Sequence, residues 1–99
     1  MRINLFAGLA HAYGRDSVAV DEDLATVRDA VSYLLEAGSP GLRKELLQLL
    51  GEWPAASRRP AGSGLSILLN GRNVEFLDGL DTVLGPGDVV TLIPPAAGG

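Results

Sequence analysis

The 99-residue chain contains no cysteine, only 5% aromatic residues and a single lysine, Lys44. Without cysteine it can form no disulfide framework, thiol catalytic site or thiolate metal site. No apolar run approaches the roughly 18 residues of a membrane span, and "MRINLFAGLAHAYG" at the N-terminus lacks a signal-peptide pattern. These absences predict a cytoplasmic protein with no membrane partner, whose fold needs no covalent cross-links.

Positive charge is also scarce, since 8 Lys and Arg face 12 Asp and Glu and the net charge is −4. Nucleic-acid binding needs a concentrated basic face, so we expect no nucleic-acid partner. Only Arg58 and Arg59 are locally basic, within a segment typical of a solvated loop. The hydrophobic content of 46% is enough for one core, and the length is that of one domain.

Alternating apolar residues predict two strands near the N-terminus. Residues 2–7 place Ile3 and Leu5 on one face and Phe6 on the other, and residues 16–23 repeat the alternation. The second segment is therefore expected to pair with the first. The connection "GLAHAYGR" is too long for a two-residue turn, which predicts an irregular loop.

The most secure helix is predicted over residues 25–38. Thr26 and Asp29 have the spacing of a capping box, and Gly38 provides a stop. The apolar stripe of this helix consists of Leu24, Val27, Val31, Leu34 and Leu35. A second, shorter helix with a weaker stripe is predicted within residues 41–53.

The C-terminal half contains turn signals and β-branched residues. Residues 54–64 have the composition of a mobile loop, and Asn70-Gly71 predicts a tight hairpin. A reversal at residues 85–88 precedes "DVVTLI", which is apolar on both faces and so predicts a central strand.

This element order predicts an α+β fold of the β-grasp, ubiquitin-like type. We expect a mixed sheet of four to five strands on one main helix, plus a short second helix, with the domain spanning residues 1–93 and a tail at 94–99. A ferredoxin-like fold is the alternative, but it needs two full crossover helices, and the second helix is predicted to be too short.

The last residues, "LIPPAAGG", have an unusual pattern. Pro94 and Pro95 fix φ and favour an extended backbone, whereas Gly98 and Gly99 lack a Cβ and can pass through a narrow channel. The pattern predicts a stiff stalk with a slim tip, which suits an end that another protein must thread or react with.

Several segments together resemble the ubiquitin-like sulfur carriers. They are "LFAGLAHAYG", "ATVRDAV" and "LNGRNVEFLDGLDTVLGPGDVVTLIPPAAGG". The similarity is to the small subunit of molybdopterin synthase and to the archaeal small modifier proteins, and at the C-terminus also to a sulfur carrier used in cysteine synthesis.

This resemblance implies that the Gly99 carboxylate, preceded by Gly98, is the reactive group. An E1-like adenylating enzyme would activate it with ATP and Mg, and a sulfur donor would convert it to a thiocarboxylate for molybdopterin synthesis. The larger molybdopterin synthase subunit would then receive the tail. Alternatives are conjugation through Gly99 to lysines of target proteins, a carrier role in another pathway such as cysteine synthesis, or a plain interaction module with an unimportant tail.

A docking surface is predicted on the face of the sheet that the main helix leaves uncovered. Phe6, Leu68 and Ile93 fall on that face by alternation, and the resemblance supports partner contacts at Phe6 and Ile93. Pro94 and Pro95 would contact the partner as the stalk enters it. In the alternative, the second helix covers this face through Leu50 and Trp53.

Other residues suggest no catalysis within the chain. His11, the only histidine, is expected in a loop with no second ligand nearby, so no metal site is predicted. We find no nucleophile–base pair, and expect a carrier that binds no cofactor, has no active site of its own and is a monomer when free. If the protein is itself modified by isopeptide bonds, Lys44 is the only side chain available.

Overall fold

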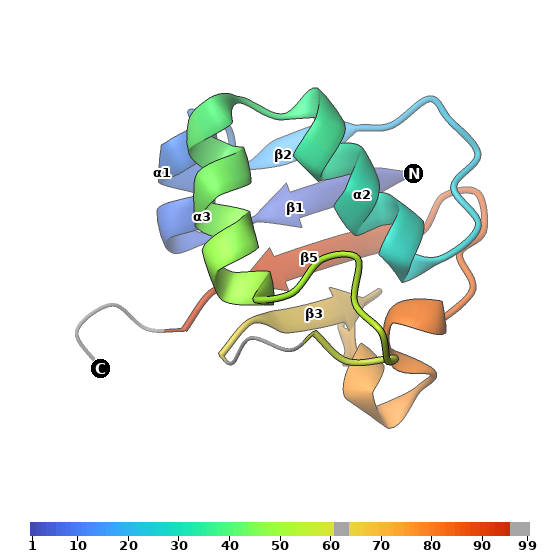
Figure 1. Ribbon diagram of the computed structural model, residues 1–99. Helices are drawn as coiled ribbons and strands as arrows, with labels where there is room; N and C mark the ends of the chain where they lie inside the picture. Colours follow the sequence, from blue (N-terminus) through green and yellow to red (C-terminus); the bar gives the residue numbers. More distant parts are fainter. Residues whose placement is uncertain (61–63, 96–99) are drawn as a thin grey trace.

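The computed structural model describes residues 1–60 and 64–95, and within them five strands form one mixed sheet (Figure 1). The strands are β1 (Arg2–Leu5), β2 (Ser17–Ala19), β3 (Ser66–Leu69), β4 (Arg72–Asn73) and β5 (Val89–Ile93). Their order across the sheet is β2-β1-β5-β3-β4. β1 and β5 are parallel, and the other neighbouring pairs are antiparallel. β5 is therefore a central strand, as predicted.

Alternation along the strands divides the sheet into a buried face and an open face. The buried side chains are Ile3, Leu5, Ile67, Val90 and Leu92. They meet in register, since Ile3 pairs with Val90 and both Leu5 and Ile67 pair with Leu92. Residues paired across strands share a face, so these side chains form one continuous apolar layer.

The helix α2 (Val27–Ala37) lies across the buried face and confirms the main predicted helix (Figure 1). Thr26 Oγ1 accepts a hydrogen bond from the Asp29 N–H at 3.3 Å, and the Asp29 carboxylate accepts one from the Thr26 N–H at 3.2 Å. This capping box provides partners for N–H groups that the first turn cannot satisfy within the helix. The side chains that α2 buries are Val27, Ala30, Val31, Leu34 and Leu35.

The second predicted helix is longer than expected. α3 (Pro40–Leu50) has 11 residues, as many as α2. Ser39 Oγ accepts a hydrogen bond from the Leu42 N–H at 3.2 Å, and Pro40 occupies the first turn, where no N–H is needed. α2 and α3 lie on the same face of the sheet (Figure 1), with Leu50 fully buried and Trp53 packed against the same core. The alternative in which Leu50 and Trp53 cover the open face is therefore wrong.

The connection between β1 and β2 is a helix rather than the irregular loop predicted. α1 (Ala7–Tyr13) buries Leu9 in the core and ends at Gly14, whose φ of 77° is in the left-handed region. The Gly14 N–H donates to the Ala10 carbonyl at 2.8 Å, a common way to close a helix. His11 consequently lies on the exposed surface of a helix, not in a loop.

The predicted hairpin is present, but its second strand is short. Asn70 and Gly71 have φ values of 50° and 86°, as a two-residue turn with both residues left-handed requires. β4 stops after two residues because the side chain of Asn73 accepts the Glu75 N–H at 2.9 Å. Residues Val74–Phe76 consequently form a 3-10 turn instead of extending the strand.

The hairpin turn also fixes the beginning of β5. Asn70 donates through Nδ2 to Asp88 Oδ1 at 3.0 Å and accepts the Val89 N–H at 2.9 Å. The other Asp88 oxygen accepts the Gly85 N–H at 2.7 Å. The Asn70 amide, together with the Gly85 N–H, lowers the pKa of the Asp88 carboxyl below its usual value, because both donors favour the ionised form.

The described part of the segment predicted as a mobile loop is tied to α2 by Arg28. The guanidinium donates to the carbonyls of Ala55 at 2.7 Å and Ser57 at 3.0 Å. It also pairs with the Asp81 carboxylate, 3.2 Å away in a second 3-10 turn (Gly79–Asp81). The mobility of this segment stays a prediction.

Together these elements confirm the predicted β-grasp fold. The described residues contain three α-helices rather than one main helix and a short second one. The ferredoxin-like alternative begins with a parallel crossover unit, whereas β1 is antiparallel to β2, so that alternative is wrong. None of the described helices combines the length and apolar character needed to cross a membrane.

Candidate functional site

The predicted reactive tail leaves the molecule at the end of a central strand. β5 ends at Ile93, after which Pro94 is half-buried and Pro95 is exposed. Neither proline has an N–H to donate, so the hydrogen-bond ladder cannot continue through them. The predicted reactive residues Gly98 and Gly99 lie outside the described residues. The structure thus places the base of the tail, which we define as residues 93–95.

Phe6 lies beside this base. Its N–H donates to the Leu92 carbonyl at 3.2 Å, which extends the pairing of β1 with β5 by one residue. Asn4 pairs with Thr91, so the continued register places Phe6 next to Ile93 on the open face. The structure brings together these two residues that were predicted to contact a partner.

The backbone explains why Phe6 is exposed. Phe6 is extended, with φ −122° and ψ 156°, and precedes α1 without using its side chain as a cap. Ala7 then takes a φ of 49°, in the left-handed region, and directs the chain into the helix. A non-glycine residue in this region costs about 1–2 kcal/mol. Phe6 is left 51% exposed at the point where β1 turns into α1.

Leu68 lies further from the tail than Phe6 does. It pairs with Thr91, whereas Ile93 pairs with Ser66, so Leu68 and Ile93 are diagonal neighbours on adjacent strands. Both are half-buried. We call Phe6, Leu68 and Ile93 the tail-side patch. Its apolar centre is the Phe6–Ile93 pair, and Thr91 separates Leu68 from the β1 side.

A shallow depression beside Phe6 was not predicted from the sequence. It has a volume of about 490 Å³ and is lined by Arg2, Asn4, Leu5, Phe6, Ala7, Ala10, Asp16 and Ser17. It therefore combines a guanidinium and a carboxylate with an aromatic ring. The alternation that puts Phe6 on the open face puts Arg2 and Asn4 there too, and this pattern could have indicated the depression from the sequence.

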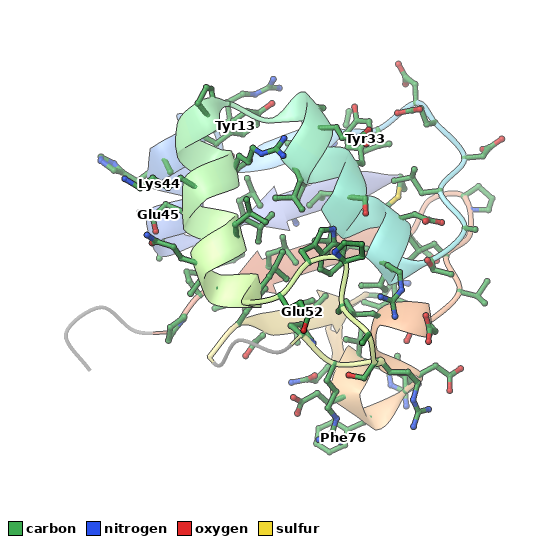
Figure 2. The ribbon with its side chains drawn as sticks, viewed as in Figure 1. Tyr13, Tyr33, Lys44, Glu45, Glu52 and Phe76 are labelled. Carbon is green, nitrogen blue, oxygen red and sulfur yellow. The ribbon has the colours of Figure 1, made fainter. Side chains whose placement is uncertain are left out.

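Lys44 is displayed on the outer surface of α3, next to Glu45 (Figure 2). The only other amine that the sequence provides, the N-terminus of Met1, is partly buried and donates to the Val20 carbonyl at 3.3 Å. Lys44 is therefore the more accessible of the two.

A second exposed phenylalanine lies away from the tail. Phe76 is 84% exposed in the 3-10 turn that follows the edge strand β4 (Figure 2). No predicted site residue is associated with it. It offers an internal comparison for Phe6, because both are exposed aromatic side chains on the same domain.

Across residues 1–60 and 64–95, no group of three or more His, Asp or Glu residues could hold a metal ion. In the same part of the chain, the predicted site consists of a binding surface next to the base of the tail.

Three comparisons relate this architecture to known proteins. The profile of the ThiS family matches residues 3–99. Small archaeal modifier protein 3 of Haloferax volcanii is 36% identical over 101 residues, covering 100% of this chain and 98% of its own length. A protein of Archaeoglobus fulgidus described as a candidate sulfur carrier is 30% identical over 91 residues, covering 92% of this chain and 93% of its own length. The solution structure of small archaeal modifier protein 1 from Methanosarcina acetivorans matches with a TM-score of 0.75 at 26% identity, covering 99% of this chain and 94% of that one.

Proposed function

This chain belongs to the ThiS family, and we propose that it is a ubiquitin-like sulfur carrier that reacts through the carboxylate of Gly99. An E1-like adenylating enzyme supplies ATP and Mg. The Gly99 carboxylate attacks the α-phosphorus of ATP and releases pyrophosphate. Sulfide from a sulfur donor then attacks the acyl carbon of the adenylate, AMP leaves, and a thiocarboxylate remains. The carrier is the substrate of this chemistry, not its catalyst.

One observation carries the proposal. The chain ends in Gly98-Gly99 behind Pro94-Pro95, directly after a strand held on both sides in the sheet and beside the exposed Phe6. A carboxylate is a poor acyl donor until its oxygen becomes a good leaving group, so the terminus has to enter another protein's nucleotide site. Residues without a Cβ suit that entry, and an apolar patch beside the base suits the docking that precedes it.

We place the carrier in molybdopterin synthesis, as a monomer that joins a larger synthase subunit. The resemblance of the C-terminal segment to the small synthase subunit supports this pathway. A carrier role in cysteine synthesis is the alternative within the same chemistry. Incubation of the thiocarboxylated carrier with the larger synthase subunit and its sulfur-free precursor tests the choice, because only the correct pair consumes the thiocarboxylate.

A second function, protein conjugation, is favoured by the relative named as a modifier protein, which is similar along its whole length. In this case a lysine amine attacks the Gly99 carbonyl of the acyl-adenylate, AMP leaves, the nitrogen loses a proton and an isopeptide bond forms. Arg72 is the last Lys or Arg of the chain, so trypsin would leave the long peptide of residues 73–99 on a target lysine. An Ala97→Arg variant shortens that remnant to Gly-Gly and makes conjugation easy to detect.

Intact-mass spectrometry tests the proposed function. The protein is incubated with the activating enzyme, ATP and a sulfur source, and we expect a mass gain equal to the difference between sulfur and oxygen. Deletion of Gly98 and Gly99 should abolish the gain while binding to the enzyme persists through the tail-side patch. A gain that survives the deletion would refute the proposal. If the variant lacking Gly98 and Gly99 loses sulfur transfer but still replaces the wild-type protein in the cell, the plain interaction module is favoured.

A further inference from the structure

Gly64 lies directly against the base of the tail. The antiparallel register of β3 and β5 pairs Ser66 with Ile93, and two further steps along the same register bring Gly64 opposite Pro95. A Cβ on Gly64 would lie 2.9 Å from both Cβ and Cγ of Pro95 and 3.3 Å from its Cδ. These distances leave no room for a side chain. Only glycine allows the proline ring to rest on the backbone here.

Among the described glycines, only Gly64 makes its close approach to the tail: the close neighbours of Gly79 belong to Arg58, and those of Gly38 belong to Leu34 and Leu42. Gly64 has a φ of 92°, and Gly14, Gly71 and Gly87 have similar values of 77°, 86° and 82°. At those three glycines an added Cβ would meet nothing within 4 Å. The left-handed backbone alone therefore explains glycine at the three turns, whereas Gly64 has the contact with Pro95 as a second requirement.

The contact lies where it can direct the tail. Pro94 and Pro95 have fixed φ, so the placement of the Pro95 ring fixes the end of the described backbone, from which the chain continues. We propose that Gly64 is a positioning residue: it seats Pro95 and so directs the reactive end relative to the docking residues Phe6 and Ile93. The reaction that it serves rests on the proposed function, but the contact itself does not.

Nuclear magnetic resonance tests the contact without any activity. In the wild-type protein, nuclear Overhauser effects are expected between the Gly64 Hα protons and the ring protons of Pro95. The Gly64→Ala variant should lose these effects and shift the resonances of Pro95, whereas Gly71→Ala should retain them. Absence of the effects in the wild-type protein would overturn the inference, whether or not the carrier can be activated.

Kinetics of activation test the consequence. We expect Gly64→Ala to lower the kcat of thiocarboxylate formation by about tenfold or more, because small displacements of a reacting group cost large factors in rate. KM should stay within about twofold, since the tail-side patch still docks. Partial unfolding would act differently: the carrier is the substrate, so fewer folded molecules would raise the apparent KM and leave kcat unchanged.

Gly71→Ala is the matched control. It forces alanine into a similar left-handed backbone, but nothing lies within reach of its methyl group. Its kcat should equal that of the wild-type protein. Equal losses of kcat in Gly64→Ala and Gly71→Ala would overturn the inference, because backbone strain in any turn would then be enough to explain the loss.

A double-mutant cycle shows whether the effect passes through Pro95. In the Pro95→Gly background the ring is absent, so adding Gly64→Ala should change kcat by less than about twofold. A loss that remains about tenfold in that background would overturn the inference. If the wild-type chain is not activated at all, the proposed function fails, and the magnetic resonance result alone decides on Gly64.

Discussion

If the chain docks as proposed, replacement of Phe6 by alanine should weaken its binding to an E1-like adenylating enzyme, and the exposed area of Phe6 gives the size of the effect. A fully covered aromatic side chain buries about 150–250 Å². Phe6 is 51% exposed, so docking would cover about 100 Å² more. At about 25 cal/mol per Å² this corresponds to about 2.5 kcal/mol, or roughly a 70-fold increase in Kd.

Phe76→Ala is the control for this prediction. Phe76 is the more exposed of the two, at 84%, but follows the edge strand β4 and lies away from the base of the tail. Its removal should leave Kd within about twofold of the wild-type value, since interface energy concentrates in a few anchoring residues. A general effect of surface hydrophobicity would weaken both variants alike.

Isothermal titration with the E1-like adenylating enzyme in the absence of ATP measures docking apart from chemistry. Thermal unfolding of each variant checks that the fold is intact, as expected for side chains that are half-exposed or more. An unchanged Kd for Phe6→Ala would refute the assignment of the tail-side patch as the docking surface. Equal weakening by Phe6→Ala and Phe76→Ala would refute it too.

Three further predictions concern charged residues elsewhere in the chain. Arg28→Ala should lower the free energy of unfolding by about 2 kcal/mol, because it leaves two carbonyls and a carboxylate without their partner. The control Arg58→Ala removes only an exposed ion pair with a separation of 3.9 Å and should lower the free energy of unfolding by less than about 0.5 kcal/mol. Urea unfolding of both variants measures the difference. Asp88 has a lowered pKa in the folded chain, so its contribution to stability is complete at neutral pH and is lost as the pH falls through the ordinary aspartate range and below. In urea unfolding, Asp88→Asn should be less stable than the wild-type protein at pH 7, and the difference in stability between the two proteins should shrink in acid. If copies of the protein become conjugated to one another, the isopeptide bond should form at Lys44. Lys44→Arg should then abolish the ladder of covalent oligomers in gel electrophoresis, and a ladder that persists would point to the N-terminal amine.

The sequence predicted those elements whose signals are local. α2 has a capping box and an apolar stripe, and the hairpin has Asn70-Gly71 at its turn, so both could be placed in advance. α1 gave no such signal: no side chain caps it, and only Leu9 is buried. Its first residue, Ala7, has a strained backbone that residue type does not indicate. The second helix was predicted only within residues 41–53, although Pro40 suits the first turn of a helix and is the residue at which α3 begins.

Alternation predicted which residues share a face, and therefore placed Phe6 and Ile93 on the open side of the sheet. It could not predict their neighbours across strands, because these depend on register between segments far apart in the chain. Arg28 reaches Asp81 and the Ala55 carbonyl over such distances. The contact of Gly64 with Pro95 has the same origin. In the sequence Gly64 belongs to a Pro/Gly/Ser-rich stretch and gives no sign that it faces the tail.

A tail on a central strand differs physically from a tail on an edge strand. β5 is hydrogen-bonded to β1 on one side and to β3 on the other, and its side chains Val90 and Leu92 are fully buried. Detaching its end would break two ladders and expose part of the core, which is unfavourable in a domain of ordinary stability. In the proposed function, a partner that binds the tail would therefore leave the patch formed by Phe6, Leu68 and Ile93 in place. The distance between the tail-side patch and the base of the tail therefore stays constant, and in the proposed function Pro94 and Pro95 set the direction from which the tail enters its partner.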